Sequence, residues 1–388
     1  MYYPKAYKFS SATYNAKIRG IGPNFTITTK IVHHSGENLG WGTQVFHIEK
    51  FEGSKKIQTL PIYPLQFHPD PDRIRRHLIQ RGREYLSLTE KPTCREYRDF
   101  AIKAGGNNAR SRARGGRPSM GKESELEERF DSTGRIIVDP VAFSRYDSNS
   151  PLLDPMYTVK IDRKQLADDD IMFCNHRVLG FSFRAKEWGA FAVNQITNVI
   201  WNDTAFDRLI LDEKKQRMIS NLVTAHQVDS AGPGVGKTLT AEAVAEMTQR
   251  PLYVVSAGEL GTNIITTDDR LSMALEMARR WGCVLLIDEA DVFLHKRNIG
   301  NLERNALVSL FLRRLEYFEG IMILTTNRDK DMDEAFTSAW PHAFQVQLPF
   351  VGRNKPIQVV ERFSESSAER DHLAVSEETR NVAGQRLL

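Results

Sequence analysis

A glycine-rich segment that ends in a lysine and a threonine has the residue types of a phosphate-binding loop. The sequence AGPGVGKTLTAEAVAE starts at Ala231. Glycines let successive backbone N–H groups point at an anion, and the helix that follows adds the positive end of its dipole. A lysine in this position reaches the outer phosphates, and a threonine hydroxyl is placed for Mg²⁺. The residues expected to contact phosphate are Gly232, Pro233, Gly234, Val235, Gly236, Lys237, Thr238 and Leu239.

This segment alone does not identify a phosphate-binding loop, because a Gly/Pro turn before a surface helix has the same residue types. A second motif is therefore needed. It follows as CVLLIDEAD, from Cys283 to Asp291. Five apolar residues bounded by an acidic pair predict a buried parallel strand that presents Asp288 and Glu289 at its carboxyl end. Ligands of open α/β sheets bind at that end. We expect Asp288 to hold Mg²⁺ together with Thr238, and Glu289 to accept a proton from an attacking water. The alternative is an acidic pair that only caps a helix.

A third element, GIMILTTNRD, has an apolar strand at Ile321 to Leu324 that ends in Thr325, Thr326 and Asn327. Together the three motifs resemble an AAA+ ATPase, and the resemblance covers about residues 201–349. It implies binding of ATP with Mg²⁺ and hydrolysis of ATP. It also implies that Lys237, Glu289 and Asn327 are catalytic, with Asn327 orienting the water.

The sequence between the motifs resembles that of a group of uncharacterised fungal AAA proteins with a long N-terminal region. The expected fold class is α/β: a P-loop αβα core with a parallel sheet, preceded by a β-rich α+β domain. We expect the N-terminal domain at 1–200 with a disordered basic insertion at 103–126, the ATPase core at 201–350, and a truncated or divergent lid at 351–388. The resemblance further implies a homo-oligomeric ring that remodels an unknown macromolecule.

The composition is that of an ordinary globular protein. It has 388 residues, 41% of them hydrophobic, and its 53 basic and 49 acidic residues leave a formal charge of only +4. That charge is too small to indicate a nucleic-acid or membrane partner. Three scattered cysteines favour neither a disulfide framework nor a zinc site, and fit a reducing compartment. No run approaches the ~20 apolar residues of a membrane span. We therefore expect an intracellular protein of the cytoplasm or nucleus.

The N-terminal region alternates apolar and polar residues up to about residue 68, which predicts antiparallel strands. His33 and His34 are expected to be solvated on such a strand. Asp70-Pro71-Asp72 predicts the start of a helix that continues to Leu86, with Arg73, Arg75, Arg76 and Arg81 on a solvated face.

The segment from Lys103 to Lys122 has six basic residues and no acidic one. Polyanion binding through it is an alternative function, but nucleic acid is disfavoured because no aromatic residue is available for base stacking.

Two features depart from the resemblance and weaken the expectation of activity, and a third argues against the threading of polypeptides. Ala339 stands where similar proteins have an arginine that contacts the neighbouring subunit's nucleotide; such a residue is worth about 10³ to 10⁵ in rate in related GTPases. Leu260 and Gly261 stand where threading machines have an aromatic residue and a glycine. Residues 351–388 are polar and predict at most one or two loose helices in place of a lid. A nucleotide-binding scaffold without turnover is therefore the main alternative to an ATPase.

A further departure lies immediately before the loop. Similar ATPases have an apolar strand there, in the middle of the sheet, whereas this chain has only Gln227-Val228-Asp229-Ser230 after a predicted helix at 213–226. Four residues at ~3.3 Å each cannot cross a sheet. The sequence thus predicts either a gap beside Ile321 to Leu324 or the segment Phe344 to Leu348 moved in to fill it.

Overall fold

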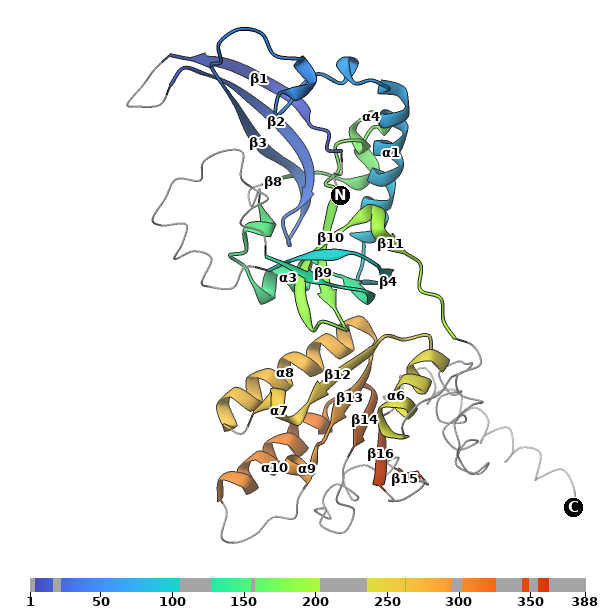
Figure 1. Cartoon of the computed structure of the whole chain (residues 1–388). Coiled ribbons are helices and arrows are strands. Elements are labelled where there is room, and N and C mark those ends of the chain that lie inside the picture. Colours follow the sequence, from blue (N-terminus) through green and yellow to red (C-terminus); the bar gives the residue numbers. More distant parts are fainter. Residues whose placement is uncertain are drawn as a thin grey trace, which may run out of the picture. The chain divides into compact units, whose positions relative to one another are not determined.

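The computed structural model describes residues 4–16, 22–104, 128–154, 158–202, 236–261, 263–294, 302–325, 344–348 and 355–362. The chain divides into two compact units, residues 1–200 and 201–388, here called the N-terminal and C-terminal units (Figure 1). The N-terminal unit is built on two antiparallel sheets, and the C-terminal unit on one sheet with helices on both sides. Both parts of the expected fold class are confirmed.

The first N-terminal sheet has the strand order β1-β2-β3-β8 with antiparallel pairing throughout. Its strands are β1 (Lys8–Asn15), β2 (Asn24–His34), β3 (Leu39–Glu49) and β8 (Thr158–Lys160). The alternation in the sequence of β2 explains the sheet, because successive side chains of a strand point to opposite faces. The expectation of antiparallel strands in this region is confirmed.

The second N-terminal sheet has the order β11-β4-β7-β9-β10-β5-β6. Its strands are β4 (Thr93–Tyr97), β5 (Phe100–Lys103), β6 (Arg129–Asp131), β7 (Gly134–Val138), β9 (Arg177–Ser182), β10 (Glu187–Ala192) and β11 (Ile196–Thr197). After β7 the chain turns into helix α3 (Pro140–Tyr146), because Asp139 caps it by accepting a hydrogen bond from Ala142 N–H at 3.0 Å.

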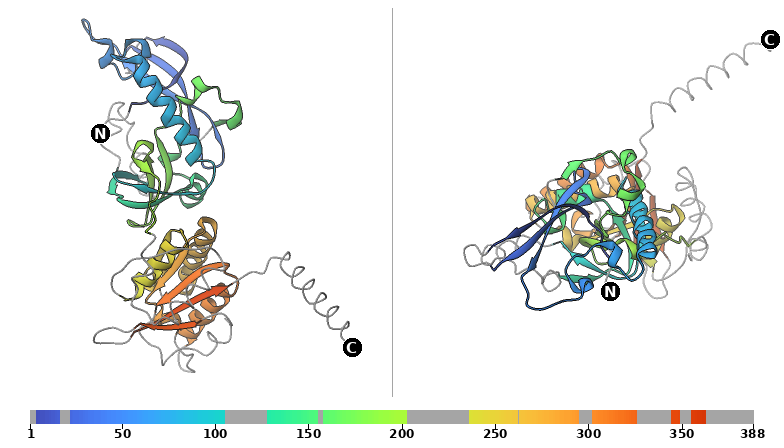
Figure 2. Two further views of the ribbon diagram at one scale, coloured as in Figure 1. Left: turned by 90° about the vertical axis from the view of Figure 1, so that its right-hand side faces the viewer. Right: turned by 90° about the horizontal axis from the view of Figure 1, so that it is seen from above.

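Helix α1 (Pro71–Leu88) begins and runs as the sequence predicts, and the Asp70 side chain accepts from the Arg73 N–H at its start. It lies alongside strands of both sheets of its unit (Figure 2). The shared core contains buried side chains from the helix and both sheets: Val32, Leu39, Tyr85, Leu88, Tyr97, Ala101, Ile136, Val138, Cys174, Val178, Phe191 and Val193. Burying each large apolar side chain contributes about 1.5–3 kcal/mol.

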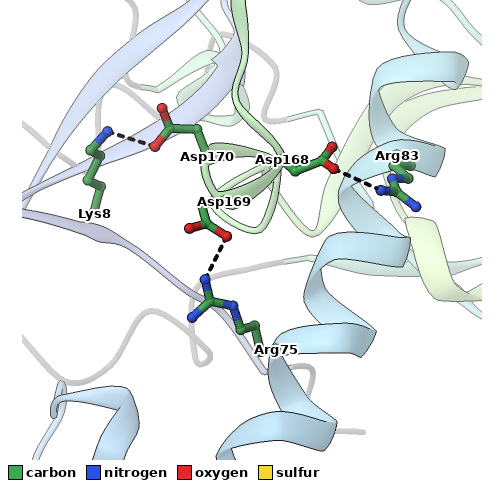
Figure 3. Close-up of polar contacts among 6 residues, drawn as sticks. All are labelled: Lys8, Arg75, Arg83, Asp168, Asp169 and Asp170. Carbon is green, nitrogen blue, oxygen red and sulfur yellow. Dashed lines mark hydrogen bonds and ion pairs between the residues drawn. The ribbon is translucent and has the colours of Figure 1, made fainter.

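A short helix, α4 (Asp168–Ile171), packs against α1. Its three consecutive aspartates each pair with a different base: Asp168 with Arg83, Asp169 with Arg75 and Asp170 with Lys8 (Figure 3). These groups are largely exposed, so each pair contributes only about 0–1 kcal/mol. The close packing lies beneath them, where Gly82 of α1 faces the Ile171 carbonyl oxygen.

Two groups of polar side chains that the sequence predicts to be solvated are buried in the N-terminal unit. His33 and His34 are only 2% and 7% exposed. The Asn175 amide lies 3.0 Å from His33 Nδ1, and the Gly36 N–H donates to His34 Nδ1. Burial lowers the pKa of both imidazoles to about 4. The prediction for these residues was wrong because both faces of β2 are covered at its end.

Arg81 is the second correction. The N-terminal segment covers its side of α1, so the guanidinium is 2% exposed and donates to the Pro4 carbonyl oxygen at 2.6 Å. Burial lowers its pKa to about 10, so it stays charged at neutral pH.

Short 3₁₀ turns complete this unit: Ile57–Thr59, Leu65–Phe67, Pro151–Leu153, Arg163–Gln165 and Val193–Gln195.

The C-terminal unit has one sheet with the order β12-β13-β14-β16-β15. The strands are β12 (Leu252–Ser256), β13 (Val284–Asp288), β14 (Gly320–Thr325), β15 (Phe344–Leu348) and β16 (Lys355–Arg362). The first three are mutually parallel, whereas β16 is antiparallel to both β14 and β15. The continuous apolar runs of β13 and β14 fit strands that are buried on both faces.

The place beside β14 is filled, but not by the predicted segment. Strand β16 pairs with β14 from Gly320↔Arg362 to Thr325↔Ile357, and Phe344–Leu348 lies on its far side. The prediction of a gap or of Phe344–Leu348 in this position was wrong, and so was the prediction of only helices after residue 351. Six residues join β15 to β16, which suits antiparallel neighbours, because a parallel crossover needs a dozen or more.

Helices lie on both sides of this sheet (Figure 1). They are α6 (Gly236–Met247), α7 (Ala257–Leu260), α8 (Ile264–Trp281), α9 (Asp291–Leu294) and α10 (Leu302–Glu316). Helix α8 begins at Ile264, because the Asn263 side chain caps it by accepting from the N–H groups of Ile265 and Thr266. Arg314 of α10 pairs with Asp268 of α8 through two hydrogen bonds. Within the described ranges, no helix is long and apolar enough to cross a membrane.

The contact at Gly82 predicts a large effect of a single methyl group. A Cβ there would lie 2.1 Å from the Ile171 carbonyl oxygen. We expect Gly82→Ala to destabilise the N-terminal unit by about 1–3 kcal/mol, because backbone must move to make room. Gly258→Ala in α7 is the control, since its Cβ would meet only the Ser256 Oγ at 3.9 Å. Urea unfolding that finds the two variants equally stable would rule out the close packing.

The buried histidines predict a loss of stability in acid. Their folded pKa of about 4 lies below the ordinary 6.5, so unfolding takes up protons between these values. The contribution of these neutral histidines to the free energy of unfolding is fully present above pH 6.5. It is lost as the pH falls toward 4, by about 2 kcal/mol per histidine between pH 8 and pH 5. Urea unfolding of the full chain across this range should show that slope. His33→Gln should flatten it, whereas His77→Gln at an exposed position should not.

Candidate functional site

Helix α6 positions the phosphate-binding end of the predicted site. It begins at Gly236, so Lys237, Thr238 and Leu239 fall in its first turn. Gly232, Pro233, Gly234 and Val235 lie outside the described residues. The helix contacts β12, β13 and β14. Small buried side chains on its later turns allow that approach: Ala241, Ala243, Val244 and Ala245 are at most 1% exposed.

Strand β13 positions the acidic pair. Val284, Leu285, Leu286 and Ile287 are completely buried, and the strand ends at the half-buried Asp288. Burial of each of these side chains contributes roughly 1.5–3 kcal/mol, which fixes the strand and so the place of its last residue. Because α6 also contacts β13, one strand supports both the predicted lysine helix and the predicted metal ligand.

The Asp288 carboxylate is held from the neighbouring strand. Thr325 ends β14, one position beyond the Ile287↔Leu324 pair, and its side chain is 1% exposed. Its hydroxyl donates to Asp288 Oδ1, and the Glu289 N–H lies 3.1 Å from the same oxygen. Two donors therefore fix Oδ1.

Glu289 adopts a left-handed backbone conformation, with φ of 55°. Such a conformation is uncommon for a residue with a side chain. Three hydrogen bonds hold the turn: Glu289 N–H reaches both Asp288 Oδ1 and Thr325 Oγ1, and Ala290 N–H donates to the Thr325 carbonyl oxygen at 2.9 Å. The Glu289 side chain is exposed while the next residue, Ala290, is buried. The turn thus presents one carboxylate to solvent directly after the anchored one.

The residue that ends the third parallel strand, β12, caps a helix instead of bonding to Asp288. Ser256 is the register partner of Asp288 on β12, but its hydroxyl accepts from the Glu259 N–H and caps α7. The Glu259 carboxylate in turn accepts from the Ser256 N–H at 3.1 Å, which completes a capping box. Thr325 is therefore the strand-end residue that orients Asp288.

The donor set at Asp288 fits Mg²⁺. This ion prefers carboxylate and water oxygens and takes only one or two carboxylates from a protein. Within the described ranges, Oδ1 has two hydrogen bonds and no group donates to Oδ2, which leaves that oxygen for a cation or its water. No group of three or more histidine, cysteine or acidic side chains suited to a metal occurs among the residues described. A magnesium ion shared with a nucleotide fits this sparse set better than a protein-enclosed metal.

Other predicted residues are placed as follows. Leu260 is buried at 1% and Gly261 ends α7 with φ of 87°, so this pair contributes to packing. Asn327 and Ala339 lie outside the described residues. Sequence reasoning gave Thr325 no role; the signal for it was a polar residue that directly ends an apolar strand next to the strand of an acidic pair.

A parallel sheet whose strand end carries an acidic pair, with a helix that starts at a glycine-lysine-threonine sequence, is typical of P-loop nucleotide-binding proteins. Residues 230–348 match the ATPase family associated with various cellular activities (AAA), so this part of the chain is an AAA domain. Residues 2–69 match a domain of unknown function, DUF7025, which spans β1 to β3.

Curated relatives match part of this chain. A probable inactive ATP-dependent zinc metalloprotease, FTSHI 2 of Arabidopsis thaliana chloroplasts, is 30% identical over 40% of this chain and 19% of its own length. The chloroplastic FTSH 2 of Oryza sativa subsp. japonica is 32% identical over 33% of this chain and 21% of its own. Spastin of Anopheles gambiae is 30% identical over 30% of this chain and 15% of its own. The chain thus covers about a fifth or less of each relative.

Proposed function

We propose that the protein binds ATP with Mg²⁺ in its AAA domain and hydrolyses it slowly, and that hydrolysis drives remodelling of a macromolecule not yet identified. The observation that carries this proposal is the anchored Asp288 carboxylate, with one oxygen fixed by two donors and the exposed Glu289 directly after it. Such an arrangement suits a Mg²⁺-nucleotide and an attacking water.

The residue roles follow from chemistry and position. The N–H groups from Gly232 to Leu239 would bind the phosphates, with Lys237 neutralising the outer ones. Thr238 and Asp288 would hold the Mg²⁺, which supplies charge neutralisation for the departing phosphoryl group. Glu289 would accept the proton of the water, and Asn327 would orient that water.

An inactive nucleotide-binding scaffold is the second candidate. Ala339 in place of an arginine favours it, because such an arginine stabilises charge in the transition state. The scaffold would use the same loop and Mg²⁺ but would leave Glu289 without a function.

Assembly and location complete the proposal. A homo-oligomeric ring is proposed on the basis of the AAA domain. The described cysteines, Cys94, Cys174 and Cys283, form no disulfide, which supports a proposed location in the reducing cytoplasm or nucleus. The basic segment at 103–122 keeps polyanion binding as a third candidate, although nucleic acid is disfavoured for lack of stacking aromatics.

Nucleotide binding is tested by thermal unfolding. Mg-ATP at 100 times its dissociation constant should stabilise the AAA domain by about 2.7 kcal/mol and raise its melting temperature. Lys237→Ala should abolish the rise, because the outer phosphates lose their cation. Lys91→Ala, at an exposed site of the N-terminal unit, should keep it. An equal rise in both variants would contradict the assignment of the loop.

Hydrolysis is tested by removing the base while keeping its shape. Glu289→Gln should lower the rate of phosphate release by about 10² to 10⁴-fold and leave the Mg-ATP melting shift in place. Glu319→Gln, also exposed in the C-terminal unit, should keep the wild-type rate. If wild type is already as slow as Glu289→Gln while both bind Mg-ATP, the scaffold is the correct function.

A further inference from the structure

Thr325 has three contacts with the acidic turn that follows β13. Its hydroxyl bonds Asp288 Oδ1, the same hydroxyl lies 3.0 Å from the Glu289 N–H, and its carbonyl oxygen accepts from the Ala290 N–H at 2.9 Å. One residue of β14 thereby contacts three successive residues of the neighbouring connection. No other described strand end in this sheet does so, since the Ser256 hydroxyl caps α7.

The direction of the hydroxyl proton follows from these partners. The Glu289 N–H can only donate, so it occupies a lone pair of Thr325 Oγ1. The Thr325 proton is then left for Asp288 Oδ1, which receives a second donor in the Glu289 N–H. An ionised carboxylate accepts both bonds, and charge-assisted bonds of this kind are the stronger ones. The carboxylate is therefore fixed in rotation with Oδ2 turned away from Thr325.

The same contacts hold Glu289 in its left-handed conformation. A residue with a side chain adopts φ near 55° at a cost in energy that surrounding contacts must offset. Here the Glu289 and Ala290 N–H groups both bond to Thr325. The direction in which the Glu289 side chain leaves the backbone thus depends on β14 as well as on β13.

We propose that Thr325 is a positioning residue that orients both carboxylates: it turns Asp288 Oδ2 toward the Mg²⁺ position and aims Glu289 at the attacking water. This inference rests on the proposed function, since it gives these two side chains their tasks. Thr325 stands two residues before Asn327 in the sequence, so the strand that leads to the predicted water-orienting residue also sets the base and the metal ligand.

A hydroxyl that only satisfies its buried neighbours would affect stability but not metal affinity. Partners that orient a metal ligand typically change metal affinity or activity by about 10–100-fold when removed. The measurement is the Mg²⁺ concentration that gives half of the ATP-induced melting shift, at fixed ATP, together with the rate of phosphate release. Thr325→Val keeps the shape and removes the hydroxyl, and Thr325→Ser keeps the hydroxyl.

Thr325→Val should raise the half-effective Mg²⁺ concentration about 10-fold or more and lower phosphate release by a similar factor, and Thr325→Ser should restore both. Thr267→Val is the matched control: Thr267 is also completely buried in this unit, but its hydroxyl donates to the Gly261 carbonyl oxygen. It should leave the Mg²⁺ requirement unchanged. If Thr325→Val does not fold, Thr325→Cys replaces it, because a thiol is a weak donor.

The outcomes separate the two proposals. A wild type that shows no Mg-ATP shift overturns the proposed function and this inference with it. A wild type that responds, with Thr325→Val needing no more Mg²⁺ than Thr267→Val, overturns the inference alone. A raised Mg²⁺ requirement that Thr325→Ser does not reverse also overturns it, since the hydroxyl would then not be the cause.

Discussion

The C-terminal unit depends on the hydrogen bonding of β14 along both of its edges. An apolar strand in the interior of a sheet must pair its N–H and C=O groups on both sides, because an unpaired buried group costs about 1–3 kcal/mol. On one side β13 supplies parallel partners, and on the other β16 supplies antiparallel ones from Gly320 to Thr325. The second pairing uses Lys355–Arg362, a segment that follows the other strands of the sheet in sequence. The sheet is thereby continuous from β12 to β15.

The antiparallel pairing of β16 with both of its neighbours sets the direction of β15. Because β16 is antiparallel to both neighbours, β15 runs in the same direction as β12, β13 and β14. The carboxyl ends of β13 and β14 remain side by side, which is the condition for Thr325 to reach Asp288. Strand β16 runs the other way, so it cannot deliver the chain to a loop at that edge. It pairs with β14, but its carboxyl end lies at the opposite edge of the sheet from those of β13 and β14.

Much of the fold was accessible from the sequence, and the reasons differ between elements. The helix of α1 was clear because Asp70, Pro71 and Asp72 are a strong start signal, and the strands β13 and β14 were clear because they are apolar without interruption. The position of β16 was not, because half of its residues Lys355–Arg362 are charged or carry an amide, and its pairing with β14 depends on contacts between segments far apart in the sequence. The burial of His33, His34 and Arg81 was missed for a related reason. Periodicity within one element cannot show which later or earlier segments cover it.

The candidate site was predictable by residue but not by interaction. Asp288 and Glu289 followed from the end of an apolar run, whereas their anchoring by Thr325 depends on the register between two strands 36 residues apart. The left-handed turn at Glu289 was equally out of reach, because glutamate has no preference for that conformation. In both cases the decisive quantity is a distance between elements, and spacing along the chain does not contain it.

The two halves of the proposed site rest on different supports. The acidic half is set by two buried, paired strands and by hydrogen bonds between them. The phosphate-binding half has the start of α6, which is held against the sheet by small buried side chains such as Ala241 and Ala245. In the proposed function this helix carries Lys237 and Thr238 in its first turn. Phosphate binding depends mainly on several N–H groups and one lysine, and tolerates small displacements. Catalysis does not, because a displacement of about 1 Å can lower the rate by on the order of 10²-fold. In the proposed function, the hydrogen bonds between Thr325 and the Asp288–Glu289 turn therefore matter most for turnover, because they hold the two carboxylates in the half of the site where small displacements are costly.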